Sequence, residues 1–220
     1  MKAMILAAGL GKRMLPLTRD CPKPLLKVAG RPLIEHHLLR LAAAGISEVV
    51  INTAYLADKL ESYLGNGKQF GVNIQYSREG EPLETAGAIA FAAPLLGKQP
   101  FILVNGDVFT DYSFESLKGI DPEIAHIVLT KKPDYLVDGD FSLSGNLLLS
   151  EPRQFTYTGI GVYNPVWFTQ FPKGESIALG PILREQALAA RVTAELYTGA
   201  WYDVGTPKRL ATLEKNLRQH

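Results

Sequence analysis

The sequence is poor in cysteine, in long apolar runs and in net charge. Cys21 is the only cysteine among 220 residues, so no disulfide can form within the chain, and the cysteine and histidine spacing of a zinc site is absent. No stretch approaches the roughly 20 apolar residues of a membrane-spanning helix. The apolar start from Ala3 to Gly11 is too short for a signal peptide. These absences predict a soluble protein of a reducing compartment, the cytoplasm.

The charges of the chain nearly cancel. There are 23 Lys and Arg residues against 22 Asp and Glu residues, which gives a formal net charge of +1. This balance offers no electrostatic argument for binding nucleic acid or an anionic membrane. We therefore expect small-molecule partners, and the sequence does not indicate an oligomeric state.

Short apolar segments alternate with helical patterns in the first half of the chain. Strands are expected at 3–8, 48–53, 72–76 and 101–104, and helices at 32–44, 57–64 and 85–96. This order predicts a parallel sheet with helices on both faces. Ligands of such sheets bind beyond the carboxyl ends of the strands, where Gly9, Asn105 and Asp107 stand.

The pattern of the second half is less regular. Strands are expected at 125–130, 141–143, 147–149, 157–163, 191–197 and 200–204, and helices at 181–190 and 207–217. We expect one Rossmann-like α/β domain spanning residues 1–220, with a mixed, mostly parallel sheet.

The most informative segment follows the first strand. It runs from Ala7 to Thr18 (AAGLGKRMLPLT) and is followed by Pro22-Lys23-Pro24. Its glycines allow backbone N–H groups to approach an anionic ligand. It is not a dinucleotide fingerprint, which needs glycine where Met14 stands, and it does not fit a Walker A loop. Its prolines exclude a regular helix between residues 9 and 27.

This segment resembles the signature of the sugar-1-phosphate nucleotidyltransferases, also called nucleotide-sugar pyrophosphorylases. Four further segments are similar to motifs of that family and follow in the same order, at 79–88 (EGEPLETAGA), 104–107 (VNGD), 157–160 (YTGI) and 201–207 (WYDVGTP). In the family they form the nucleobase segment, the first metal aspartate, a sugar-side strand and the second metal aspartate. The resemblance covers essentially the whole chain and implies the GT-A-like nucleotidyltransferase fold.

The resemblance also implies roles for individual residues. Arg13 and Lys23 would be catalytic, and Asp107 and Asp203 would hold Mg²⁺. The nucleotide would contact Ala8, Gly9, Gly11, Lys12, Arg13, Lys23, Glu79, Thr85 and Gly87. The sugar phosphate would contact Asn105, Gly139, Asp140, Glu151 and Thr158.

The chemistry of the reaction is consistent with this set of side chains. Attack of a sugar phosphate oxygen on an α-phosphate joins two anions, so charge neutralisation and alignment matter more than a proton acceptor. Neutralisation and alignment can be supplied by one Lys, one Arg and a metal ion held by two carboxylates. The metal would be Mg²⁺, which prefers carboxylate and phosphate oxygens. Asp111 and Asp140 are the competing carboxylates.

The choice of base and sugar rests on fewer residues. The Glu79 carboxylate can accept from the N3–H of uracil and suits cytosine less well. The short chain without hexapeptide repeats, together with EGEPLET and VNGDVFTDY, is most similar to the branch that transfers UMP from UTP to N-acetylmuramate 1-phosphate in bacterial cell-wall recycling. The alternatives are GTP with mannose 1-phosphate, UTP or dTTP with glucose 1-phosphate, and a non-catalytic regulatory subunit. The regulatory alternative is disfavoured because the chain has every charged residue that the reaction would use, namely Arg13, Lys23, Asp107 and Asp203.

Two positions depart from the family pattern. Many members have Glu-Lys-Pro near the sugar, with the lysine on the sugar phosphate, whereas this chain has Glu151-Pro152-Arg153. Arg153 either replaces that lysine, or pairs with the carboxylate of N-acetylmuramate, or is a solvated surface charge. Glu84 stands where several members have glycine.

Overall fold

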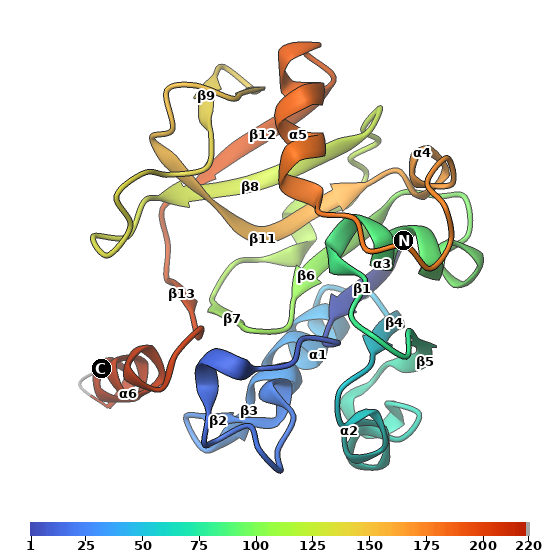
Figure 1. Cartoon of the computed structure of the whole chain (residues 1–220), viewed down its shortest axis with the longest axis vertical. Helices are drawn as coiled ribbons and strands as arrows, with labels where there is room; N and C mark the ends of the chain where they lie inside the picture. Colours follow the sequence, from blue (N-terminus) through green and yellow to red (C-terminus); the bar gives the residue numbers. More distant parts are fainter. Residues whose placement is uncertain (219–220) are drawn as a thin grey trace.

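The protein is built around one nine-stranded sheet with the strand order β5-β4-β1-β6-β11-β8-β12-β10-β9 (Figure 1). The computed structural model describes residues 1–218. The strands of the sheet are β1 Lys2–Leu6, β4 Glu48–Thr53, β5 Asn73–Arg78, β6 Phe101–Asn105, β8 Ala125–Lys131, β9 Ser142–Ser144, β10 Leu147–Leu149, β11 Phe155–Tyr163 and β12 Val192–Tyr197. The α-helices are α1 Leu33–Ala43, α2 Ala57–Leu64, α3 Glu84–Leu96, α4 Pro165–Phe168, α5 Leu179–Leu188 and α6 Pro207–Leu217.

The four strands of the first half are parallel, as the alternating pattern predicts. Ile5 of β1 lies between Ile51 of β4 and Val104 of β6. In the second half, β11 and β10 run opposite to the other strands, because both pair antiparallel with each of their neighbours. The predicted mixed, mostly parallel sheet is confirmed.

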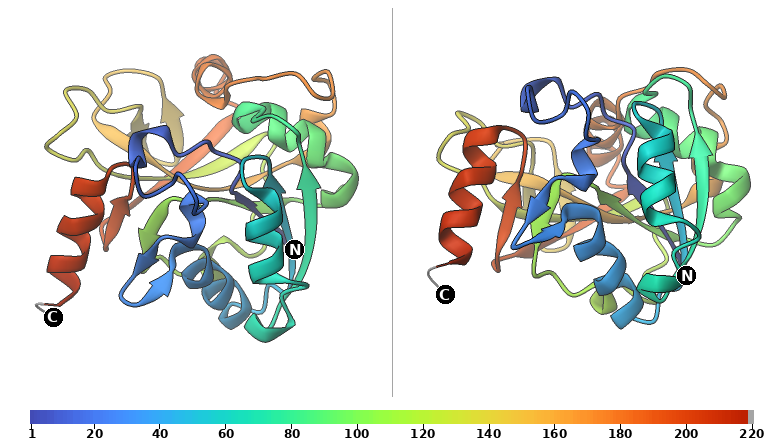
Figure 2. Two further views of the ribbon diagram at one scale, coloured as in Figure 1. Left: turned by 60° about the horizontal axis from the view of Figure 1, so that its bottom comes forward. Right: turned by 90° about the horizontal axis from the view of Figure 1, so that it is seen from below.

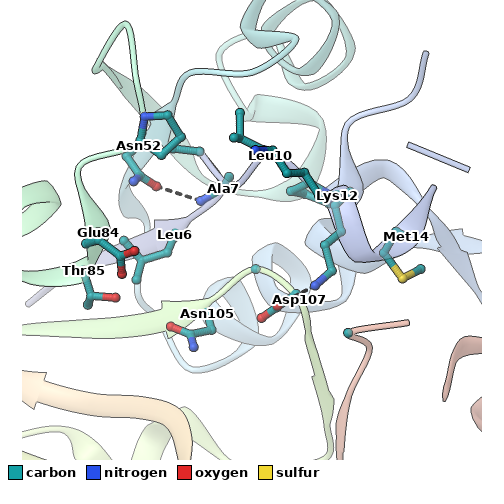
Figure 3. A pocket seen from close by; sticks show the side chains of 18 of the residues that line it. Leu6, Ala7, Leu10, Lys12, Met14, Asn52, Glu84, Thr85, Asn105 and Asp107 are labelled. Atoms are coloured by element: carbon teal, nitrogen blue, oxygen red, sulfur yellow. Dashed lines mark hydrogen bonds and ion pairs between the residues drawn. The ribbon is translucent and has the colours of Figure 1, made fainter. Parts of the chain in front are cut away.

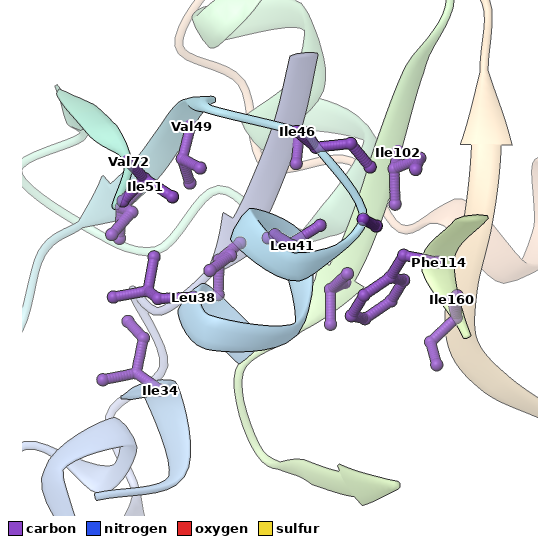
Figure 4. Close-up of a cluster of buried hydrophobic side chains, with 14 of the residues drawn as sticks. Ile34, Leu38, Leu41, Ile46, Val49, Ile51, Val72, Ile102, Phe114 and Ile160 are labelled. Carbon is purple, nitrogen blue, oxygen red and sulfur yellow. The ribbon is translucent and has the colours of Figure 1, made fainter. Parts of the chain in front are cut away.

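Helices cover both faces of the sheet, which was also predicted. Side chains alternate along each strand, so that Ile102 faces α1 while Leu103 faces the opposite layer, which α3, α4 and α5 form. Figure 4 shows Leu38 and Leu41 of α1 among the strand residues of the first layer. Within residues 1–218, no helix is both long and apolar enough to cross a membrane.

The segment between β1 and α1 is folded rather than loose. It contains two 3-10 turns, Lys12–Met14 and Lys23–Leu25, and the short strands β2 Lys27–Val28 and β3 Arg31–Pro32. The prediction that it holds no regular helix is confirmed. Helix α6 packs on this segment instead of on the sheet (Figure 2), through a third apolar cluster of Met14, Leu26, Val28, Leu33, Val204 and Leu213.

Two helices begin earlier than the sequence pattern indicates. Helix α5 starts at Leu179 instead of Pro181, and α3 starts at Glu84 instead of Thr85. Glu84 has a φ of 60°, which is the left-handed region that glycine enters at lower cost than other residues. This backbone conformation gives a physical reason why glycine suits the position in the family that the sequence resembles.

Helix α1 buries a histidine completely, and this predicts an acid-sensitive fold. Burial lowers the pKa of His37 to about 4, whereas an unfolded histidine titrates near 6.5. Between these pH values the unfolded chain binds the extra proton, so the stabilisation is complete above pH 6.5 and is lost as the pH falls toward 4. We expect this group to lower the free energy of unfolding by about 1.4 kcal/mol per pH unit below about pH 6.

Denaturant titrations at pH 7, 6 and 5 measure this effect. The His37→Leu variant should show a shallower pH dependence than the wild type. His36→Leu is the matched control, because it removes the adjacent histidine ring, which is partly exposed. Equal slopes for the wild type and His37→Leu would contradict the prediction.

Candidate active site

A pocket of about 500 Å³ lies at the carboxyl ends of β1, β4, β5 and β6. Ten of the residues predicted to bind the nucleotide, the sugar phosphate or the metal, or to act in catalysis, line it. They are Ala8, Gly9, Gly11, Lys12, Arg13, Lys23, Glu79, Thr85, Asn105 and Asp107. The strands end together at this edge because they are parallel, as the sequence pattern implies.

Two glycines bring the segment after β1 close to the end of β6. Gly11 has a φ of +62°, and a Cβ atom there would come within 2.9 Å of Thr18, whose hydroxyl donates to the Gly11 carbonyl at 2.7 Å. Gly106 donates its N–H to the Leu6 carbonyl at 2.9 Å, and a Cβ atom would lie 2.6 Å from that oxygen. The residue after Gly106 is Asp107, which is thereby held beside the glycine segment.

Lys23 and Asp107 form an ion pair inside the pocket. The distance from Lys23 Nζ to Asp107 Oδ2 is 2.6 Å, and the Lys23 side chain is only 12% exposed. Pro22 and Pro24 on either side of the lysine are buried, and they restrict the backbone that carries it. The cation is therefore held in place next to the carboxylate before any ligand binds.

The strand expected at 200–204 forms, but outside the main sheet. It places Asp203 close enough to Asp107 for the two charges to interact, although Asp203 does not line the pocket itself. This aspartate lies in β13 Trp201–Asp203, which pairs outside that sheet with β7 Val108–Thr110, so that Asp203 is opposite Val108. Val204 then donates its N–H to the Asp107 carbonyl at 2.9 Å. This pairing brings two aspartates that are far apart in the sequence to one place.

The two carboxylates share one electrostatic environment. Burial and the nearby charge of Asp107 raise the pKa of Asp203. Arg209 of α6 offsets this, with its Nη1 atom 2.5 Å from Asp203 Oδ2. Each aspartate is thus paired with its own cation, Lys23 or Arg209.

This donor set fits a hard divalent cation. Two neighbouring carboxylates that repel each other gain from a shared cation, and Mg²⁺ takes its remaining ligands from phosphates and water. Within residues 1–218, no group of three or more His, Cys, Asp or Glu side chains could hold a metal ion. Asp107 and Asp203 would therefore need substrate oxygens to complete the coordination of the metal.

One pocket residue was missed from the sequence. The Asn52 side chain accepts from the N–H of Ala7 at 2.7 Å and donates to Glu79 Oε1 at 2.8 Å. The second Glu79 oxygen accepts from the Leu83 N–H at 3.2 Å, and burial raises the pKa of this glutamate. The signal was present, because Asn52 is a polar residue near the end of an otherwise apolar strand.

Figure 3 shows the two ends of the pocket. Asn52, Glu84 and Thr85 lie on one side, Asp107 lies on the other, and Asn105 is seen between Thr85 and Asp107. The pocket therefore separates the carboxylate and amide groups expected to meet a base from the charged pair expected to meet phosphates.

Two of the predicted contact residues are buried and lie outside the pocket lining. A Cβ atom on Gly87 would come within 2.2 Å of the Glu175 carbonyl, so glycine lets the segment before α5 pack on α3. Thr158 is fully buried and donates to the Val128 carbonyl at 2.7 Å. The structure accounts for both residues by packing, and their roles toward ligands stay predictions.

The other three predicted sugar contacts also lie outside this pocket. A Cβ atom on Gly139 would be 2.5 Å from the Phe155 carbonyl. Asp140 Oδ2 accepts from the Tyr157 N–H at 3.0 Å. Glu151 forms an exposed ion pair with Arg153 at 3.0 Å. Their contacts with a sugar likewise stay predictions.

The fold and the charged pocket are typical of α/β enzymes that bind nucleotides. Comparisons with known proteins identify the family. The nucleotidyl transferase family profile matches residues 2–130. The N-acetylmuramate alpha-1-phosphate uridylyltransferase of Neisseria meningitidis serogroup B is 48% identical over 96% of this chain and 95% of its own length. The enzyme of the same name from Caulobacter vibrioides is 34% identical over 99% and 97%. The chain belongs to the nucleotidyl transferase family, which confirms the resemblance found in the sequence.

A solved structure supports the fold independently. A Bacillus anthracis protein, assigned provisionally as a glucose-1-phosphate thymidylyltransferase and crystallised with sucrose, superimposes with a TM-score of 0.85. The alignment covers 100% of this chain and 96% of that protein at 23% sequence identity. At this identity the similarity shows the shared fold alone.

Proposed function

We propose that this enzyme transfers UMP from UTP to N-acetylmuramate 1-phosphate, giving UDP-N-acetylmuramate and pyrophosphate. The observation that carries this proposal is the 48% identity to the N. meningitidis uridylyltransferase over nearly the whole of both chains. The reaction would serve the recycling of cell-wall sugars, and the enzyme would act in the cytoplasm, where UTP is available.

The pocket supplies the charges that this reaction needs. A phosphate oxygen of the sugar attacks the α-phosphorus of UTP, the new P–O bond forms, and the bond to the β-phosphate breaks to release pyrophosphate. Lys23 and Arg13 would neutralise the charge that develops on the transferred phosphoryl group. A Mg²⁺ ion on Asp107 and Asp203 would supply further neutralisation.

The base would be read at the other end of the pocket. Asn52 and the Leu83 N–H orient the Glu79 carboxylate, which can still accept from the N3–H of uracil through its remaining lone pairs. Thr85 lines the pocket beside it. A base without an N–H at this position leaves those remaining lone pairs without a donor, and a site built to pair with an N–H can discriminate strongly.

Pyrophosphate release tests the proposed function. We expect UTP with N-acetylmuramate 1-phosphate to give the highest kcat/KM among four nucleoside triphosphates paired with N-acetylmuramate, N-acetylglucosamine, glucose and mannose 1-phosphates. A tenfold advantage for glucose or mannose 1-phosphate, about 1.4 kcal/mol in transition-state binding, would contradict the sugar assignment. Absence of release with every pair would favour a regulatory protein.

A further inference from the structure

A second cavity, of about 640 Å³, lies beyond Asp203. It is open to solvent and is bordered by residues 130–135, by β13 and by the beginning of α6. Gly205 lines the first pocket and packs against two residues of the second, since a Cβ atom on that glycine would come 2.8 Å from Asp203 Oδ1 and 2.9 Å from Arg209 Nη1. The cavity therefore adjoins the place where the sugar phosphate must react.

The lining of this cavity is largely apolar, and cations outnumber carboxylates among its charged side chains. Its charged side chains are Lys131, Lys132, Lys208, Arg209, Asp134 and Asp203. The amino end of α6 also borders the cavity. This end is capped by Thr206, whose hydroxyl oxygen accepts from the Arg209 N–H at 3.3 Å. A helix begins with a partial positive charge, so the cavity favours an anionic group.

Arg209 is the cation in this lining that is best placed to bind a carboxylate. Its Nη1 atom pairs with Asp203, and its guanidinium carbon lies 3.8 Å from the centre of the Tyr135 ring. Among residues 1–218, its Nε and Nη2 atoms have no hydrogen-bond partner. A guanidinium fixed in this way keeps donors for a charge-assisted hydrogen bond to an acid.

We propose that Arg209 binds the carboxylate of the lactyl group on the sugar and thereby selects N-acetylmuramate 1-phosphate. The inference rests on the proposed function. N-acetylmuramate differs from N-acetylglucosamine only by the lactyl ether at the 3-position, whose carboxylate is costly to bury unpaired. In this proposal the 1-phosphate lies at Asp107 and Asp203, and the 3-position of the sugar ring lies in the second cavity, which Arg209 lines.

The structure disfavours Arg153 as that cation. Its Nε atom is already 3.0 Å from Glu151, the side chain is 47% exposed, and it borders neither cavity. A solvated ion pair of this kind contributes little. Of the options that the sequence left open for Arg153, the surface charge agrees best with this geometry.

The test compares two sugars in several variants. With UTP as donor, the ratio of kcat/KM for N-acetylmuramate 1-phosphate to that for N-acetylglucosamine 1-phosphate is measured. We expect Arg209→Gln to lower this ratio by about 10- to 100-fold, the range for losing a hydrogen bond to a charged group, mainly through a higher KM for the muramate. Arg209→Lys keeps a charge beside Asp203 without the planar fork and should also lower the ratio.

Two further variants complete the design. Arg191→Gln is the matched control, because Arg191 also pairs with a carboxylate, Glu123, at 2.5 Å and lies outside both cavities. It should leave the ratio unchanged, and Arg153→Gln should do the same. If Arg209→Gln leaves the ratio unchanged, the inference is overturned and the proposed function stays intact. This includes the case in which kcat/KM falls equally for both sugars. A wild-type enzyme without preference for the muramate overturns both.

Discussion

Replacement of Lys23 by alanine is expected to lower turnover by roughly 10²- to 10³-fold, the range for removing one preorganised transition-state donor. The lysine is nearly buried, and its Nζ atom lies 2.6 Å from Asp107 in the pocket. Flanking prolines restrict the backbone that carries it. Steady-state pyrophosphate release at saturating substrates measures the effect.

Folding has to be controlled in this experiment, because the alanine variant leaves Asp107 without its cation. Thermal unfolding should show that the variant is folded at the assay temperature. Lys27→Ala, at an exposed position of β2, is the matched control and should retain wild-type turnover. A folded Lys23→Ala enzyme with near-wild-type turnover would remove Lys23 from the catalytic groups.

Substitution of asparagine for Asp107 or Asp203 is expected to raise the Mg²⁺ concentration for half-maximal activity by tenfold or more. Loss of even a group that only supports a metal ligand typically costs 10- to 100-fold in affinity, and here one of two protein ligands would lose its charge. Asparagine keeps the size of the side chain, so the comparison isolates that charge. Mg²⁺ titrations of activity, together with Mn²⁺ binding followed by electron paramagnetic resonance, provide two readouts.

Asp111→Asn and Asp140→Asn are the controls, because both carboxylates compete with the chosen pair in the sequence. Asp140 is occupied by the Tyr157 N–H and Asp111 by the Tyr197 hydroxyl. Both control variants should keep the wild-type metal dependence. A change confined to the controls would show that the metal site has been assigned to the wrong aspartates.

The elements of the first half could be predicted because their signal is local. A run such as EVVINT at 48–53 is apolar enough for a strand covered on both faces, and the structure has β4 with those bounds. The second half gave no comparable signal for its pairings. β11 lies antiparallel between β6 and β8, and the alternation along a strand does not specify its neighbours.

The sequence alone determined the glycine segment, the charged residues around it and the position of Asp107 at the end of a buried strand. Each of these follows from residues that are adjacent in the chain. Only the tertiary structure decided that Asp203 joins Asp107, that Asn52 orients Glu79 and that Arg209 faces a second cavity. These contacts depend on pairing and packing between distant segments, such as β7 with β13 and α6 with the segment after β1. No local periodicity encodes such contacts, because they depend on which surfaces remain to be buried once the sheet has formed.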